Sequence, residues 1–480
     1  MKKIMLCYPP GDLSTKLKNR YKFNLQDIIP PAMRACNDLG YMATTLQKAG
    51  NDVLLKDYKI TKASALDFLD DILKYCPDMI VMTTSYANIF EDLKLVRMIK
   101  SSNPQIVVLL KGEMFFDAPE EVLSNLPLGS VDYLIGSDAA FIMPLIVKAH
   151  FEANELLYQI PFLTICKNGI FQKTNFHAPH GNIAELPFPA RDLMHNQYYY
   201  RPDTKKVTAT IYTSNGHSSD SIYCPEKDLS ANTLNIRPAK NVFDEMYECY
   251  SKYGIKSFLF PSDSFTNDEK WMEEFCDSII NSPMRNDVEW IANVDIAKFT
   301  EYMAMEMRDA GCKLLIMRFD CGTEDSLLRM KRGFTLDECY NAVDIAEKQK
   351  LKIFGMYSIG LPWESEEHIL ATRKMMMKIS SDIMSLAMPI PYPGTCLEKL
   401  FRDENILREQ TVFSDAIRIP AVGTKFLTNK KLRRFRRKTL LLYYLNPKYA
   451  WKKFVQGIKR PSLFKKYFYF LLDLYSDKRR

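Results

Sequence analysis

The segment PDMIVMTTSY, residues 77–86, decides the fold of the first part of this 480-residue chain. Its apolar run from Met79 to Thr83 lies between amphipathic segments at 63–75 and 91–101. Short apolar runs separated by helical patterns are typical of parallel strands buried on both faces. Comparable runs lie at 3–7, 53–56, 106–110 and 131–135. The alternation predicts a five-stranded, doubly wound parallel α/β sheet over residues 1–153.

The carboxyl ends of these strands form the predicted ligand edge, because ligands of doubly wound sheets bind there. Small or polar residues follow three of the strands: Thr83 and Thr84, then Gly112, then Gly136. We expect these four residues to line a binding site.

A second alternation occupies residues 206–400. Strand candidates lie at 207–213, 257–260, 288–292, 314–319, 353–358 and 383–388, with helical patterns between them. Six strand and helix units predict a partial TIM-type (β/α)6 barrel, with the active site at the carboxyl ends of its strands. Residues 154–205 contain AELPFPARDL, and because prolines disfavour regular structure this segment is predicted to be an irregular connector.

Residues 401–480 are predicted to form a helical, basic tail. From Lys425 to Arg480 the chain has 18 basic and 2 acidic residues, a balance of 18 − 2 = +16, whereas the rest has 47 − 56 = −9. Leucines and aromatic residues are interleaved with the lysines, which favours a membrane anchor from Lys430 onward on anionic lipid. The alternative is an apolar face packed on the barrel and a solvated basic face. Nucleic acid is not expected as a partner, because no nucleic-acid-binding motif accompanies the basic residues.

The composition is that of a globular protein, with 47% hydrophobic and 26% charged residues. We see no signal peptide after Met1 and no apolar stretch of spanning length, so we expect a cytoplasmic protein, peripheral at the inner face of the membrane through its tail. The eleven cysteines show no paired framework and are interpreted as buried thiols or ligands.

The segment YTSNGHSSDSIYCPEK, residues 212–227, follows the first barrel strand. His217, Ser221 and Cys224 stand at relative spacings of four and three. Three cysteines at those spacings would hold an iron-sulfur cluster, and here only the last is a cysteine.

Ten segments in order resemble the radical S-adenosylmethionine (SAM) enzymes that carry an N-terminal cobalamin-binding domain. The resemblance covers residues 3–400. The segments are IMLCYPP, LGYMATTLQKAGNDVLLKDY, PDMIVMTTSY, VDYLIGSD, LPFPARDL, the loop at 212–227, FPSDSFTND, MRFDCGTEDSLLRMKRGFT, FGMYSIGLPWESEE and PYPGTCLEKL.

This resemblance implies a four-iron four-sulfur cluster, whose open iron chelates SAM and cleaves it to a radical. Cys224 matches the third cysteine of the family, and His217 and Ser221 stand in place of the first two. Histidine can ligate iron, but a neutral serine is a poor ligand. Cys321 is a candidate for a replacement thiolate. The alternative is that His217 and Ser221 are ordinary loop residues.

The resemblance also implies a SAM pocket. Tyr223 matches the aromatic position beside the adenine, and Asp263 matches the contact to the SAM amino group. Asp320 replaces a usual glutamate near the ribose. The backbone segment that lies against the adenine is matched by Ser358, Ile359 and Gly360.

For cobalamin, the resemblance assigns Gly112 and Gly136 to the close approach of the nucleotide tail. Lys111 and Ser137 depart from the family's glycine-rich pattern, and the chain has no Asp-x-His-x-x-Gly motif for a lower axial ligand.

The sequence therefore predicts a cobalamin-binding radical SAM protein, a methyltransferase-type enzyme of secondary or lipid metabolism with an impaired cluster site. Its substrate is expected to be a small or lipid-like molecule. The alternative is a non-catalytic descendant that acts as a binding subunit or as the partner of another protein. No catalytic residue is assigned.

Overall fold

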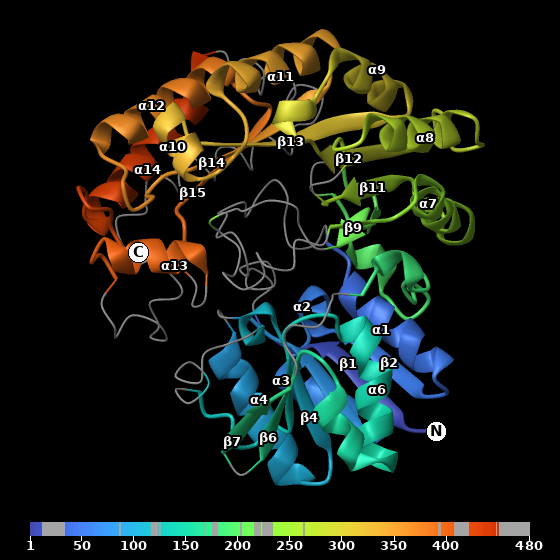
Figure 1. Cartoon of the computed structure of the whole chain (residues 1–480). Helices are drawn as coiled ribbons and strands as arrows, with labels where there is room; N and C mark the ends of the chain where they lie inside the picture. Colours follow the sequence, from blue (N-terminus) through green and yellow to red (C-terminus); the bar gives the residue numbers. More distant parts are fainter. Residues whose placement is uncertain are drawn as a thin grey trace.

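The structure is a computed structural model, and Figure 1 shows two α/β halves that meet near α1. It describes residues 1–11, 34–85, 88–116, 123, 126–167, 169–174, 181–201, 204–215, 222, 234–262, 265–391, 395–407, 422–447 and 449–450.

The first half contains the predicted doubly wound sheet. Its parallel strands are β1 (Lys3–Tyr8), β2 (Asp52–Asp57), β3 (Met79–Thr83), β4 (Val107–Lys111) and β5 (Tyr133–Ile135), in the order β2-β1-β3-β4-β5. The helices are α1 (Asn37–Lys48), α2 (Tyr58–Thr61), α3 (Ala65–Tyr75), α4 (Ile89–Ser102) and α6 (Ala139–Glu152). Met79 and Val81 belong to the core beneath α1 and α6, and Ile80 and Met82 to the core beneath α3 and α4. The apolar run in β3 is continuous because both faces are covered.

The predicted number of strands is wrong, because two antiparallel strands extend this sheet to seven. β6 (Leu163–Lys167) pairs with β5, and β7 (Ile170–Lys173) pairs with β6. Both come from the segment that was expected to be an irregular connector. They join at Gly169, whose φ of 77° suits a tight turn, and β7 is a half-exposed edge strand. Two such short, partly exposed strands give too weak a pattern to be recognised in the sequence.

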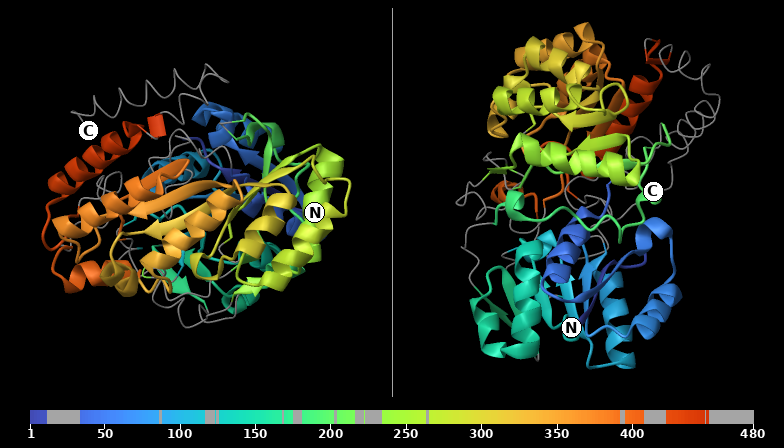
Figure 2. Two further views of the ribbon diagram at one scale, coloured as in Figure 1. Left: turned by 90° about the horizontal axis from the view of Figure 1, so that it is seen from above. Right: turned by 90° about the vertical axis from the view of Figure 1, so that its right-hand side faces the viewer.

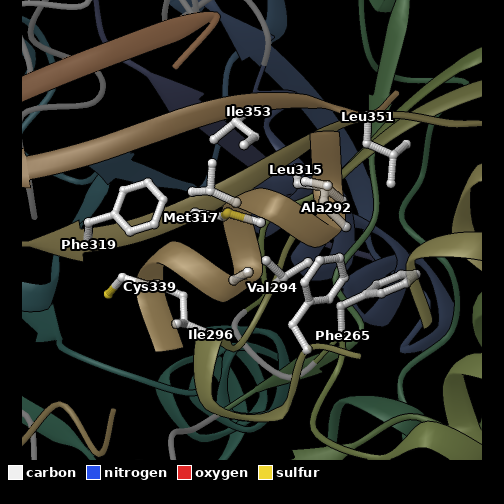
Figure 3. Packing of buried hydrophobic residues seen from close by; sticks show 14 of the residues in the cluster. Phe265, Ala292, Val294, Ile296, Leu315, Met317, Phe319, Cys339, Leu351 and Ile353 are labelled. Carbon is white, nitrogen blue, oxygen red and sulfur yellow. The ribbon is translucent and has the colours of Figure 1, made fainter. Parts of the chain in front are cut away.

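The second half is the predicted partial barrel. Its strands are β8 (Thr208–Thr210), β11 (Ser257–Phe260), β12 (Glu289–Asn293), β13 (Cys312–Asp320), β14 (Lys352–Ser358) and β15 (Ile383–Ala387), all parallel and adjacent in chain order. The helices are α7 (Ala239–Tyr253), α8 (Glu269–Ile280), α9 (Glu301–Asp309), α10 (Glu324–Arg329), α11 (Leu336–Lys348), α12 (Glu366–Ile379) and α13 (Cys396–Asp403). Figure 3 shows the apolar layer beneath the helices, with Met317 and Phe319 of β13 near Cys339 of α11.

A last helix, α14 (Asn429–Tyr444), packs beside α12 at the edge of the barrel (Figure 2). Its buried residues include Leu432, Leu440 and Tyr443, which belong to the barrel core. For the described part of the tail this corrects the expectation of a membrane anchor from Lys430 onward, because the apolar face is already covered by protein. Residues 451–480 lie outside the described residues. None of the helices in the described ranges is long and apolar enough to cross a membrane.

Candidate functional site at the carboxyl ends of the barrel strands

Asp320 and Ser358 end neighbouring strands, since Asp320 pairs in register with Tyr357. Asp320 has a left-handed φ of 57°, and its Oδ2 lies 2.7 Å from Nε of Arg332. The guanidinium of Arg332 therefore holds this carboxylate in place at the end of β13.

Ser358 and the two residues after it form a fixed turn. The hydroxyl of Ser358 is buried and has no hydrogen-bond partner among the described residues. The amide of Ile359 donates to the carbonyl of Ala387 at 3.0 Å, and the amide of Gly360 donates to Oε2 of Glu364 at 2.6 Å. Of these three residues only Ser358 has a polar side chain, and its place in a SAM pocket stays a prediction.

The carboxylate of Glu364 holds this turn in place by accepting backbone hydrogen bonds. It is fully buried, and its Oε2 also accepts from the amide of Leu361 at 3.0 Å. Burial raises the pKa of this carboxyl to about 7. Gly360 has a φ of 104°, and a Cβ there would lie 3.3 Å from Cδ1 of Leu432. Helix α14 thus contacts the turn that the resemblance assigns to the adenine.

Five predicted site residues lie outside the described residues: His217, Ser221, Tyr223, Cys224 and Asp263. The structure describes the base of the loop that contains the first four, where β9 (Ser214–Asn215) pairs with β10 (Asn235–Ile236). Within the described ranges, no three His, Cys, Asp or Glu side chains are grouped as a metal site.

Cys321 does not fit the role of a replacement thiolate. Its thiol is buried and lies 3.9 Å from Sδ of Met330. Burial raises the pKa of this thiol well above its usual range, which favours the neutral form. At the three loop positions where the resemblance places cysteines, the sequence has one cysteine, Cys224.

A buried ionic cluster joins the two halves just before the loop, and sequence reasoning did not identify it. Glu245 of α7 accepts from Nη2 of Arg191 at 2.7 Å and from Nη1 of Arg237 at 2.6 Å. Arg237 also donates to the carbonyl of Tyr212 at 2.8 Å, and Tyr41 of α1 donates to Glu245 at 3.4 Å. The only signal in the sequence was a charged residue in the motif LPFPARDL.

The two threonines predicted at the ligand edge of the first sheet differ in their hydrogen bonds. The hydroxyl of Thr84 donates to Asp92 at 2.6 Å, and burial raises the pKa of Asp92 to about 6. The hydroxyl of Thr83 is buried without a hydrogen-bond partner in the described ranges. Lys111 Nζ lies 2.5 Å from Asp38 and so points to α1.

The two glycines of this edge serve chain packing. A Cβ at Gly136 would overlap the backbone nitrogen of Phe116, and one at Gly112 would lie 3.1 Å from the carbonyl of Thr84. At both positions a side chain would crowd the neighbouring backbone, and the assignment of these glycines to a cobalamin tail stays a prediction.

The chain is similar in sequence to two groups of curated proteins, although no family model matches it. An uncharacterized methyltransferase of Pyrococcus horikoshii is 23% identical over 410 residues, which cover 85% of this chain and 88% of that protein. The anaerobic magnesium-protoporphyrin IX monomethyl ester cyclase of Rubrivivax gelatinosus is 22% identical over 379 residues, covering 76% of this chain and 65% of that protein.

Solved structures of similar fold include radical SAM enzymes. The methyltransferase TsrM from Kitasatospora setae has a TM-score of 0.65 and 15% identity over 85% of this chain and 77% of its own. The enzyme OxsB has a TM-score of 0.71 and 11% identity over 98% of this chain and 72% of its own. Structures of TsrM hold a SAM analogue, cobalamin and a [4Fe-4S] cluster, and OxsB holds cobalamin and SAM. These are the three cofactors that the resemblance predicts. The chain thus shares the fold of solved cobalamin-dependent radical SAM enzymes, the kind of protein that its sequence motifs resemble.

Proposed function

We propose that this protein binds SAM at the carboxyl ends of β13 and β14 and is a methyltransferase-type enzyme acting on a small or lipid-like molecule of secondary or lipid metabolism. The observation that carries the proposal is the fixed turn at Ser358–Gly360 beside Asp320. The names of the relatives support it, since one is a methyltransferase and another, TsrM, is a radical SAM methyltransferase that was solved with tryptophan.

The residues at the barrel mouth have separate roles in this proposal. Asp320, held by Arg332, accepts hydrogen bonds from the ribose hydroxyls. The amides of Ile359 and Gly360 are occupied by Ala387 and Glu364, so the hydroxyl of Ser358 is the polar group of this turn that meets the adenine. Bound SAM supplies an activated methyl group.

The cluster site is proposed to be impaired. His217, Ser221 and Cys224 offer one thiolate, and Cys321 is buried as a neutral thiol, so these residues do not support chemistry that depends on a cluster. The same observation favours a second candidate function, in which the chain is a non-catalytic descendant that keeps the fold as a binding or partner subunit. The proposal that this chain binds cobalamin rests on the solved relatives alone.

Calorimetric titration with SAM tests the first part. We expect weak binding that falls at least about tenfold in Asp320→Asn, because a charge-assisted hydrogen bond is lost. Asp325→Asn changes an exposed carboxylate on α10 and should bind SAM as the unchanged protein does. No heat at millimolar SAM contradicts a SAM site.

Iron and sulfide analysis after anaerobic reconstitution tests the second part. We expect well under one cluster per chain, and a higher occupancy in the double variant His217→Cys, Ser221→Cys. A full cluster in the unchanged protein would show that the loop is not impaired.

A further inference from the structure

Helix α14 runs antiparallel to β15, so its first turns lie at the mouth of the barrel. Nε of Arg436 donates to the carbonyl of Leu386, near the carboxyl end of β15, at 2.8 Å. At the other end of the helix, the hydroxyl of Tyr443 donates at 2.7 Å to the carbonyl of Ser381, which precedes β15. Leu432, in the first turn, packs against Gly360. The amino-terminal half of α14 therefore borders the turn proposed for SAM.

This half of α14 is strongly basic. The sequence NKKLRRFRRKTLLLYY has seven basic and no acidic residues, and all seven lie between Lys430 and Lys438. Arg433, Arg436 and Arg437 are partly buried, whereas Arg434 is exposed. The helix dipole adds positive potential at the same end.

We propose that Arg433, Arg436 and Arg437 bind a phosphate or carboxylate group of the substrate at the barrel mouth. The inference rests on the proposed function and adds to it a substrate class, an anionic small molecule. Guanidinium groups suit this role, because their planar donors match the oxygens of carboxylates and phosphates. Partial burial strengthens such a contact, since solvent screens it less. Arg436 is held at the edge strand β15 by its hydrogen bond to the carbonyl of Leu386.

The test uses the full chain, with pyrophosphate as the probe in calorimetry. The test variant is Arg433→Gln with Arg437→Gln, and the matched control is Arg434→Gln with Lys438→Gln, which removes equal charge from the exposed face of the same helix. We expect the test variant to bind pyrophosphate at least about tenfold more weakly than the control, because charge-assisted contacts are lost. Equal melting temperatures of the two variants will show that the helix still packs.

Two outcomes overturn the inference: no binding of pyrophosphate by the unchanged protein, or equal weakening in both double variants. Flotation with phosphatidylglycerol vesicles separates the source of the anion. Vesicle binding that depends on Arg433 and Arg437, without pyrophosphate binding, would assign the arginines to a membrane surface instead. A parallel SAM titration keeps the two proposals apart, because selective pyrophosphate binding without SAM binding would support the anion site while contradicting the proposed function.

Discussion

Substitution of the buried residue Glu245 is the most direct test of how the two halves are joined. Glu245 is 1% exposed and contacts Arg191 at 2.7 Å and Arg237 at 2.6 Å. Glu245→Gln keeps the shape of the side chain but leaves two buried guanidinium groups without their counter-charge.

The expected loss of stability follows from the cost of an unpaired buried charge. Removing one partner of a buried ion pair costs about 3–5 kcal/mol. Because the amide oxygen of glutamine still accepts one hydrogen bond, we expect a loss of about 3 kcal/mol in the free energy of unfolding. The control is Asp244→Asn, on the same helix, which removes an exposed pair with Lys240 at 2.9 Å. That change should cost no more than about 0.5 kcal/mol.

Urea unfolding followed by two probes measures this difference. All four tryptophans lie after residue 270, so their fluorescence follows the barrel half and the tail, whereas circular dichroism follows both sheets. Because Glu245 joins the halves through Arg191 and Tyr41, the midpoints of both transitions should fall. A loss in Glu245→Gln no larger than in Asp244→Asn would refute the reasoning.

Three further changes test the packing and titration of the fold. Leu432→Ala should destabilise the barrel by about 2–5 kcal/mol, because it leaves a cavity under α14, whereas Leu442→Ala, at a site 45% exposed, should stay within about 0.5 kcal/mol by urea unfolding. Gly136→Ala should lower the melting temperature, because its Cβ meets the backbone of Phe116, and Gly129→Ala, with open space around it, should not. The raised pKa of Glu364 means that the folded protein binds this proton more tightly than the unfolded chain, so stability should fall as pH rises from about 4.5 to about 7 and then level off. In melting curves at several pH values, Glu364→Gln should lack that slope, and an unchanged slope would contradict the assignment.

The sequence by itself determined the two strand and helix alternations. β3 matches the prediction at both ends, and α12 lies between β14 and β15, where a helical pattern was predicted. These elements are set by local periodicity, because a strand buried on both faces must be apolar throughout and a helix on a sheet must be apolar on one side. The order of the motifs, rather than any one of them, indicated the family.

Only the tertiary structure decided where the segments outside the two strand and helix alternations pack. β6 and β7 extend the first sheet, Arg191 meets Glu245 and Arg237, and α14 packs its apolar face on the barrel. The Arg191 contact joins residues 54 positions apart, and Tyr443 meets Ser381 across 62 positions. No local pattern encodes such pairs, because a buried arginine and a solvated one look alike in sequence until the fold brings a carboxylate to one of them. The same holds for the leucines and tyrosines of α14, whose apolar face suits a membrane or a protein core equally, and the choice depends on whether β15 leaves an edge for it to cover.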